Sequence, residues 1–293
     1  MALTPLPDFL ADARAGGYAV GYFEAWDTYS FEAVAEAAEL ERSPVVLGFG
    51  GMMMDQGWLD RFGIEPLGAY GRAIVGRLSV PAAFILNEVW EYDHAFRGIG
   101  AGFNTVMLNS CELPFGENVA LTARLVEAAH PKGVAVQAEL GRLPNFGDDD
   151  PGELTDPAQA GEFVAATRVD CLAVSVGNMH LRTDGTCAVN RDRLRAIRDQ
   201  VDVPLVIHGG SGLSTETIAD LVNDGIALFH VGTVMKRRMW EDTQTAFAAS
   251  GTPDYQAVVG SRKPADFLSP ARAAITETVR ALMRVYGSSG RAA

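Results

Sequence analysis

Cysteine and long apolar runs are what this sequence lacks. Its 293 residues contain only 3 cysteines, Cys111, Cys171 and Cys187, and no two of them form a CxxC pair. Their number and spacing indicate neither a disulfide framework nor a thiolate metal site. A reducing compartment, the cytoplasm, is therefore expected. No stretch has the length and apolar character of a transmembrane helix, and residues 1–17 lack the basic start of a signal peptide.

Positive charge is also scarce. The chain has 24 Lys and Arg against 37 Asp and Glu, a formal net charge of −13. Because an acidic protein repels anionic surfaces, neither nucleic acid nor a membrane is an expected partner. Apolar residues make up 48% of the chain, enough for a large core, and no shift in composition marks a boundary. The sequence therefore predicts a single domain over residues 1–293.

What the chain does contain is a series of short apolar runs separated by helical patterns. The runs are rich in Val, Ile, Leu and Phe, which is typical of strands buried on both faces. They lie at 19–24, 45–50, 81–88, 105–110, 135–140, 171–176, 204–209 and 228–233. Helical patterns between them include residues 31–41, 118–130, 159–168 and 191–200. This alternation predicts the α/β class, a (β/α)8 TIM barrel with additional terminal helices.

The additional helices are predicted at the two ends of the chain. Residues 8–16 follow two prolines and predict a short helix that closes the bottom of the barrel. Residues 269–293 predict an amphipathic helix followed by a Gly/Ser tail. Within the barrel, helix N-caps are expected at Ser30, at Thr155 or Asp156, and at Ser214.

Polar and small residues stand where most of the apolar runs end. A barrel of this class places its site at the carboxyl ends of the strands. The residues expected there are Glu24, Asn87, Glu88, Asn109, Glu139, His180, His208, Gly209–Ser211 and Gly232–Thr233. Carboxylates and histidines that converge on one rim indicate a metal site.

His180 and His208 are the strongest metal-ligand candidates, because each follows a strong strand and lies beside small residues. Glu88 is the third expected ligand, and Glu139 is a fourth ligand or a partner of the others. Two imidazoles and a carboxylate suit zinc, with manganese or another divalent ion as the alternative. His230 lies within the last strand and can face either the rim or the core. His94 and His130 lie in helical patterns and are expected outside the site.

Two glycine-containing loops are candidate anion sites. Residues 208–212 read HGGSG and precede a helix, and residues 231–233 read VGT. Glycines let the backbone approach a ligand, and helix N–H groups favour negative charge. These loops make Gly209, Gly210, Ser211, Gly232 and Thr233 candidate substrate-binding residues. The alternative is that both are simply tight turns. Residues 141–157 form a long loop that is either a lid or a solvated segment without substrate contact.

At these residues the chain resembles the class II, metal-dependent fructose-bisphosphate aldolase family, which also contains tagatose-bisphosphate aldolases. The segments that carry the resemblance are residues 102–141, 154–180 and 203–218, together with the tail from 262. The resemblance implies that His180 and His208 are two of the family's three zinc histidines and that Glu139 lies near the metal. It also implies that Ser211 and Thr233 belong to the phosphate loops.

Several rim residues depart from the family pattern. Asn87–Glu88 replaces an Asp-His pair that supplies the proton-transfer residue and the third zinc ligand. An amide does not titrate in water, so Asn87 cannot act as a general acid or base. The family's glycine after the metal histidine is Leu181, and its phosphate lysine is Asp184. At three further positions the family has Asn, Asp and Asn, where this chain has Glu24, Asn109 and His230, respectively.

These observations predict a metal-dependent aldolase-type lyase that cleaves or forms a carbon–carbon bond in a non-standard ketose or ketose phosphate. Glu139, Glu24 or His230 takes over proton transfer at the catalytic position of Asn87, and Asn109 is counted among the substrate-binding residues. A homodimer or homotetramer is expected. The alternatives are a metal-dependent sugar isomerase or epimerase, and a catalytically inactive barrel that binds a sugar or sugar phosphate.

Overall fold

The strands close into a parallel barrel. The computed structural model describes residues 3–147, 149–182, 184–249, 251 and 254–292. Neighbouring strands are consecutive in the sequence, and β8 pairs with β1 to close the sheet. The strands are β1 (Val20–Ala25), β2 (Val45–Gly50), β3 (Ala82–Val89), β4 (Thr105–Leu108), β5 (Ala135–Leu140), β6 (Cys171–Val174), β7 (Leu205–Ile207) and β8 (Ile226–Val231). The predicted (β/α)8 TIM barrel is confirmed.

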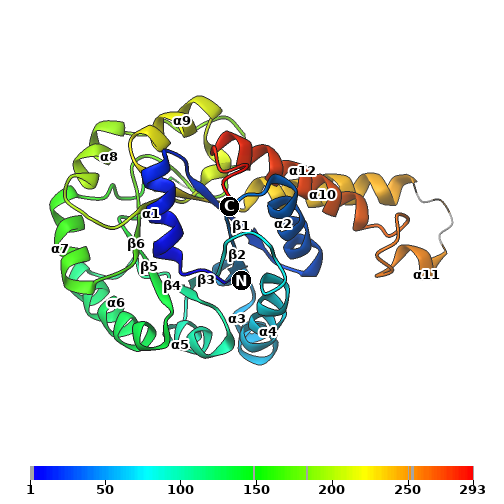
Figure 1. The fold of residues 1–293 in the computed structure, drawn as a ribbon, viewed down its shortest axis with the longest axis horizontal. Coiled ribbons are helices and arrows are strands. Elements are labelled where there is room, and N and C mark those ends of the chain that lie inside the picture. The colour runs from blue at the N-terminus through cyan, green and yellow to red at the C-terminus, as the bar shows by residue number, and fades with distance from the viewer. Residues whose placement is uncertain (1–2, 148, 183, 250, 252–253, 293) are drawn as a thin grey trace.

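Helices surround the sheet on its outer side (Figure 1). The outer helices are α2 (Thr28–Glu41), α4 (Ile64–Val75), α5 (Tyr92–Ala101), α6 (Phe115–Ala129), α7 (Pro157–Thr167), α8 (Arg191–Arg198), α9 (Thr215–Asn223) and α10 (Thr233–Ala249). The short helices α3 (Gln56–Trp58) and α11 (Tyr255–Val258) interrupt longer connections. None of the helices in the described part of the chain combines the length and apolar character that a membrane-spanning segment requires.

Both predicted terminal helices are present. Helix α1 (Leu6–Gly16) lies across one end of the barrel in Figure 1 and buries Leu6 and Leu10 against interior residues such as Val20 and Val46. Helix α12 (Ser269–Val285) packs along α2, and α10 and α12 extend beyond the barrel with α11 near the tip. The apolar bottom of the barrel is therefore closed, which leaves the opposite end for the site.

One expected helix cap is wrong, and the others are confirmed. Helix α2 begins earlier than predicted, because Asp27 is its N-cap and accepts a hydrogen bond from the backbone N–H of Ser30. Ser30 lies one turn inside the helix and completes a capping box. Asp156 caps α7 ahead of Pro157, and Ser214 caps α9.

Candidate active site

Strand alternation brings polar side chains to the open end of the barrel, the mouth. Successive residues of a strand point to opposite faces, so every second residue faces the barrel interior. On β1, Tyr22 and Glu24 follow interior Val20, and both line the pocket at the mouth. On β5, Gln137 and Glu139 share the interior face in the same way. The core therefore changes from apolar to polar along single strands.

Glu88 reaches the mouth because β3 contains an irregularity. Leu86 pairs with Val106 and Val89 with Leu108, so that β3 has one residue more than β4 between these pairs. Glu88 has a φ of 47°, in the left-handed region that favours glycine. A bulge of this kind redirects a side chain, and such features are common beside active sites. Asn87 and Glu88, which alternation alone would place on opposite faces, consequently both lie at the mouth.

His180 is placed by the loop after β6 rather than by the strand itself. The side-chain amide of Asn178 donates a hydrogen bond to the carbonyl oxygen of His208 at 3.0 Å. Gly209 has a φ of 71°, and a Cβ atom there would lie 2.0 Å from the carbonyl oxygen of Met179. Only glycine allows this close approach, which brings the loop carrying His180 against the end of β7.

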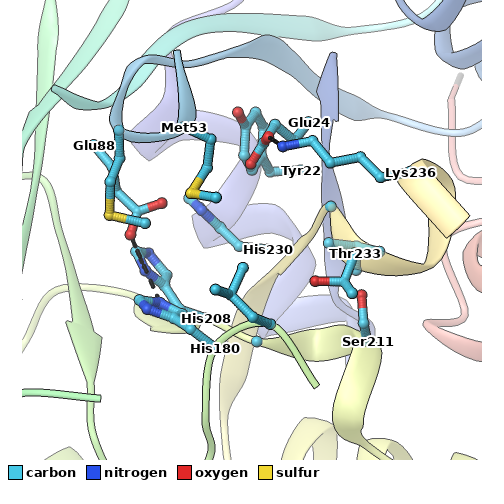
Figure 2. Close-up of a pocket in the computed structure, with 15 residues that line it drawn as sticks. Tyr22, Glu24, Met53, Glu88, His180, His208, Ser211, His230, Thr233 and Lys236 are labelled. Carbon is cyan, nitrogen blue, oxygen red and sulfur yellow. Dashed lines mark hydrogen bonds and ion pairs between the residues drawn. The ribbon is translucent and has the colours of Figure 1, made fainter. Parts of the chain in front are cut away.

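Four side chains converge at this point (Figure 2 shows three of them together on one side of the pocket). His208 Nδ1 lies 3.2 Å from Glu88 Oε1 and 3.1 Å from Glu139 Oε2. His180 Nε2 lies 3.7 Å from Glu88 Oε1. The candidate ligand atoms of Glu88, Glu139, His180 and His208 all lie within 4.8 Å of one another. Asn87 donates a hydrogen bond from Nδ2 to Glu88 Oε2 at 2.6 Å and so orients that carboxylate.

The chemistry of the four side chains suits a divalent cation. Each of them holds a buried polar atom that makes no hydrogen bond: Glu88 Oε1, Glu139 Oε1, His180 Nε2 and His208 Nδ1. Leaving a buried polar atom unpaired costs about 1–3 kcal/mol, so a cluster of such atoms calls for a partner. Imidazole nitrogen and carboxylate oxygen are ligands of zinc, and carboxylate also suits manganese. The residues therefore fit a metal.

The charged side chains of the cluster shift one another's pKa values. Burial raises the pKa of the Glu88 carboxyl, but the charges of His208 and His180 outweigh burial and hold that pKa well below its usual range. Burial lowers the pKa of His208, yet the carboxylates of Glu88 and Glu139 prevail and raise it to about 10. The two carboxylates therefore favour a positive charge beside them, either as a proton on His208 or as a cation.

Beneath the cluster lies a buried polar layer that sequence reasoning missed in part. Gln137 Nε2 lies 3.0 Å from His208 Nε2 and 3.2 Å from His230 Nε2. The ring of His230 stacks on His208 at a centroid distance of 4.2 Å and contacts Tyr22 at 4.4 Å. Burial and the charge of His208 lower the pKa of His230 well below its usual range. His230 is therefore a neutral imidazole whose buried Nδ1 makes no hydrogen bond.

The opposite side of the pocket is formed by the two glycine loops (Figure 2). The hydroxyl of Ser211 accepts a hydrogen bond from the backbone N–H of Val234, so the loop after β7 meets the start of α10. Thr233 is the first residue of α10, whose N-terminal N–H groups favour an anion. Lys236 lies one turn further on and pairs with Glu24 at 2.5 Å. The pocket has a volume of about 130 Å³.

The remaining predicted residues lie around this pocket. Gly209, Gly232 and Leu181 line it, while Gly210 packs behind His230. Leu181, where the family has glycine, keeps a glycine-like φ of 56°. Asp184 is exposed and is not among the residues that line the pocket. Asn109 lines an adjoining pocket instead, where its Nδ2 contacts Met52 Sδ.

The long loop after β5 contacts the segment that carries His180. The backbone N–H of His180 donates to the carbonyl of Pro144, and the N–H of Phe146 donates to the carbonyl of His180, both at 2.9 Å. The loop is therefore hydrogen-bonded to the segment that carries His180 and is not a freely solvated loop without contact to the site. Asp148 within it lies outside the described residues.

Two histidines and one cysteine are outside the metal cluster, as predicted. His94 pairs with Asp60, and His130 pairs with Asp170. Cys111 lies in the adjoining pocket, where burial and the charge of Glu139 raise the pKa of its thiol. A protonated thiol is a poor nucleophile and a poor metal ligand.

Three residues of the site escaped sequence reasoning, although a signal existed for each. Tyr22 and Gln137 precede the predicted Glu24 and Glu139 by two residues, which is the period of one strand face. Lys236 lies three residues after Thr233 and hence on the same side of the first helical turn.

Comparisons with known proteins agree with this geometry. The chain matches the family model for class-II fructose-bisphosphate aldolase over residues 4–291. It is 33% identical over 299 residues to the fructose-bisphosphate aldolase of Geobacillus stearothermophilus, and 32% identical over 302 residues to that of Staphylococcus aureus (strain Mu50 / ATCC 700699), with all three chains covered in full. The crystal structure of the YdjI aldolase from Escherichia coli K12 is 27% identical, with a TM-score of 0.81 and coverage of 99% of this chain and 100% of that one.

The match extends over almost the whole chain, including both glycine loops and all four residues of the cluster. It confirms the resemblance inferred from the sequence, and it supports a lyase over an isomerase, an epimerase or an inactive binding barrel. The chain belongs to the class II fructose-bisphosphate aldolase family, whose members are metal-dependent aldehyde-lyases.

Proposed function

We propose that Glu88, His180 and His208 hold a zinc ion, with Glu139 as a fourth ligand or as a partner that orients His208. The observation that carries this proposal is the convergence of four buried ligand atoms, each without a hydrogen bond, at the mouth of the barrel. Manganese is the alternative, because two carboxylates harden the donor set relative to three histidines.

We propose a ketose phosphate as the substrate, with its phosphate between the two glycine loops. A metal held by Glu88, His180 and His208 would supply Lewis-acid polarisation of the ketone carbonyl. Ser211 and Thr233 offer hydroxyl and backbone groups to the phosphate, and Lys236 supplies a positive charge if it exchanges Glu24 for the ligand. The relatives named above carry the name fructose-bisphosphate aldolase, which supports a substrate of this class.

His230 is the proposed proton carrier in place of the family's aspartate. It lines the pocket, and its Nδ1 makes no hydrogen bond. Glu24 is engaged by Lys236, and Asn87 is engaged by Glu88 and cannot titrate. Gln137 contacts the far nitrogen of His230 and so orients the ring. The third predicted carrier, Glu139, lies 3.1 Å from His208 Nδ1 and belongs to the proposed metal cluster, which leaves His230 as the candidate.

Metal content and proton exchange test this proposal together. Purified protein should contain about one divalent ion per chain by elemental analysis. In D2O it should exchange a proton of dihydroxyacetone phosphate, observed by NMR, because exchange requires only the ketone half of the site. His230→Gln should lower the exchange rate by roughly 10²–10⁴-fold with the metal retained. His130→Gln, which alters a histidine far from the site, is the control.

The outcome that contradicts the metal proposal is protein that stays metal-free after dialysis against zinc and manganese. Exchange that is unaffected by His230→Gln excludes His230 as the proton carrier.

We also propose a homodimer or homotetramer, a cytoplasmic location and a single domain over residues 1–293. Light scattering of the purified protein tests the first of these.

A further inference from the structure

A second pocket adjoins the metal cluster on the side away from the glycine loops. It has a volume of about 320 Å³ and shares Met52, Met53, His180 and Leu181 with the first pocket. Glu139 of the cluster also lines it. A substrate held at the cluster by its ketone group and in the first pocket by its phosphate must extend its other half into this space. The lining of the second pocket therefore selects the aldehyde-forming half of the substrate.

The charges of this second pocket oppose a second phosphate. Besides Glu139 it contains the carboxylates of Glu112 and Asp150, and Arg142 is the only Lys or Arg among its described lining residues. Asp150 accepts hydrogen bonds from Arg142 Nη1 at 2.5 Å and Nη2 at 3.0 Å, so the guanidinium is already neutralised. The Arg142 hydrogen bonds lower the pKa of Asp150, which keeps this partner ionised at neutral pH.

The walls of the second pocket suit the carbon skeleton of a neutral sugar. Trp90 is 44% exposed, and its indole N–H donates to the carbonyl of Met52 at 3.2 Å. This bond fixes the ring as a flat wall, and the negative face of an aromatic ring favours polarised C–H groups. Leu143 and Pro144 add apolar surface, while Asn109 offers amide groups to hydroxyls.

The contrast with the first pocket is the basis of the inference. There, backbone amides at two glycine loops, the hydroxyls of Ser211 and Thr233 and the amine of Lys236 meet one carboxylate outside the metal cluster, Glu24. In the second pocket two carboxylates outside the cluster, Glu112 and Asp150, outnumber the single arginine, and no helix of the described chain begins among its lining residues. Because like charges repel and Arg142 is already paired with Asp150, a phosphate is favoured at the first pocket over the second.

We propose that the aldehyde half of the substrate is an uncharged polyhydroxy aldehyde, so that the enzyme acts on ketose monophosphates rather than bisphosphates. This inference rests on the proposed function, since it assumes a ketone phosphate at the cluster. In cleavage, the proton carrier takes the hydroxyl proton of the carbon that becomes the aldehyde. The electron pair of the broken carbon–carbon bond stays with the ketone half, which then gains one proton at that carbon.

Condensation reactions with different aldehydes test the inference. Metal-loaded protein is given dihydroxyacetone phosphate with D-glyceraldehyde, D-erythrose or D-glyceraldehyde 3-phosphate, and kcat/KM for each aldehyde is measured. We expect kcat/KM for the uncharged aldehydes to exceed that for glyceraldehyde 3-phosphate by about tenfold or more, which is the effect of one unfavourable charge contact near a protein surface. Exchange of dihydroxyacetone phosphate protons in D2O is measured in the same preparations without aldehyde.

Two substitutions and one control variant sharpen this test. Asp150→Asn frees Arg142 and should raise kcat/KM for glyceraldehyde 3-phosphate relative to glyceraldehyde by roughly 10- to 100-fold, the effect of one charge-assisted hydrogen bond. Asp149→Asn removes the same charge from the neighbouring exposed residue, which does not line the pocket, and should leave the ratio at its wild-type value. Trp90→Ala should raise KM for erythrose about threefold to tenfold.

The outcomes separate this inference from the proposed function. Proton exchange together with a preference for glyceraldehyde 3-phosphate overturns the inference and leaves the proposed function intact. A ratio that does not respond to Asp150→Asn overturns the role assigned to the Arg142–Asp150 pair. Absence of proton exchange in metal-loaded protein overturns the proposed function, and the inference fails with it.

Discussion

Two carboxylates, Glu41 at the contact of α2 with α12 and Glu88 at the mouth of the barrel, are both largely buried, and both have lowered pKa values. Their partners differ. Glu41 is 8% exposed and accepts hydrogen bonds from Arg280, Arg284 and Ser289. Glu88 faces two histidines at 3.2 and 3.7 Å, and its Oε1 makes no hydrogen bond.

The difference separates a structural charge from a functional one. Arginine keeps its charge at any physiological pH, and its fixed geometry satisfies a carboxylate permanently. Histidine can lose its proton, and so its place beside a carboxylate can be taken by a cation. The α2–α12 contact should therefore contribute to folding stability, whereas the mouth should contribute to metal binding and catalysis. The predictions below follow from the largest expected effect to the smallest.

The largest expected effect is that of His208→Ala on catalysis. This side chain contacts both carboxylates of the cluster, and its loss removes a proposed metal ligand and leaves the charges of the carboxylates unbalanced. Because the metal supplies several kcal/mol of stabilisation in the transition state, kcat/KM should fall by about 10³-fold or more. Elemental analysis should show the metal lost at the same time. If His208→Ala keeps both its metal and its activity, the mouth of the barrel does not differ from the α2–α12 contact in the way proposed.

Glu41→Gln should lower the free energy of unfolding and leave catalysis unchanged. Burial alone would raise the pKa of Glu41, but hydrogen bonds from Arg284, Arg280 and Ser289 outweigh it and lower the pKa from 4.5 to about 2. Because Arg284 is 53% exposed and solvent screens its charge, the difference corresponds to at most about 3 kcal/mol of unfolding free energy at neutral pH. Urea denaturation should show a loss of that order, with metal content and kcat/KM retained.

The pH dependence of this loss provides its control. A carboxyl whose pKa is lower in the folded than in the unfolded chain stabilises the fold above its unfolded value of 4.5, and this stabilisation disappears as the pH falls toward 2. The gap between wild type and Glu41→Gln should therefore be constant at pH 6–8 and narrow below about pH 4.5. A gap that does not change with pH would show that Glu41 acts through packing alone.

Glu88→Gln should weaken metal binding without preventing folding. The amide has nearly the same shape but no charge, and it is a poorer metal ligand. Loss of groups that only orient metal ligands costs about 10–100-fold in affinity, so a direct ligand should reach at least the upper end of that range. Competition with a chromogenic chelator measures the change. Unchanged affinity would mean that Glu88 balances charge but does not bind the metal.

The smallest effect is expected for Leu181→Gly. Leu181 has a φ of 56°, which costs a side chain about 1 kcal/mol or more relative to glycine. Glycine loses more entropy on folding, so the net change in unfolding free energy should be a gain of less than about 1 kcal/mol. Thermal unfolding measures it, and Leu154→Gly, at an exposed residue of ordinary φ, is the control and should not be stabilised. A clear destabilisation would show that Leu181 packs as a structural residue.

The fold could be predicted almost completely from the sequence, because each strand carries its own signal. A buried parallel strand is an unbroken apolar run, and the alternation with helices indicates a barrel without knowledge of any distant contact. The position of the site also followed, since the carboxyl ends of parallel strands meet at one rim. Helix starts were less certain: Ser30 was expected to cap α2, but Asp27 does so because its carboxylate reaches the backbone N–H of Ser30.

The composition of the site depended on tertiary structure. Gln137 and Tyr22 look like ordinary strand residues in the sequence, and only closure of the barrel brings them to His208 and His230. The pairing of Lys236 with Glu24 joins residues that are 212 positions apart in the sequence. The sequence could not indicate that Arg142 is already neutralised by Asp150, although this decides the charge of the second pocket.

The sequence by itself determined the barrel, its rim and the residue types available for a metal and an anion, because these follow from local periodicity and strand direction. Tertiary structure alone decided which of those residues meet. The irregular pairing of β3 with β4, together with the positive φ of Glu88, turns this carboxylate toward His208, while strict alternation would have pointed it at the surrounding helices. A redirection of this kind depends on the strand beside it, and no pattern within β3 encodes it.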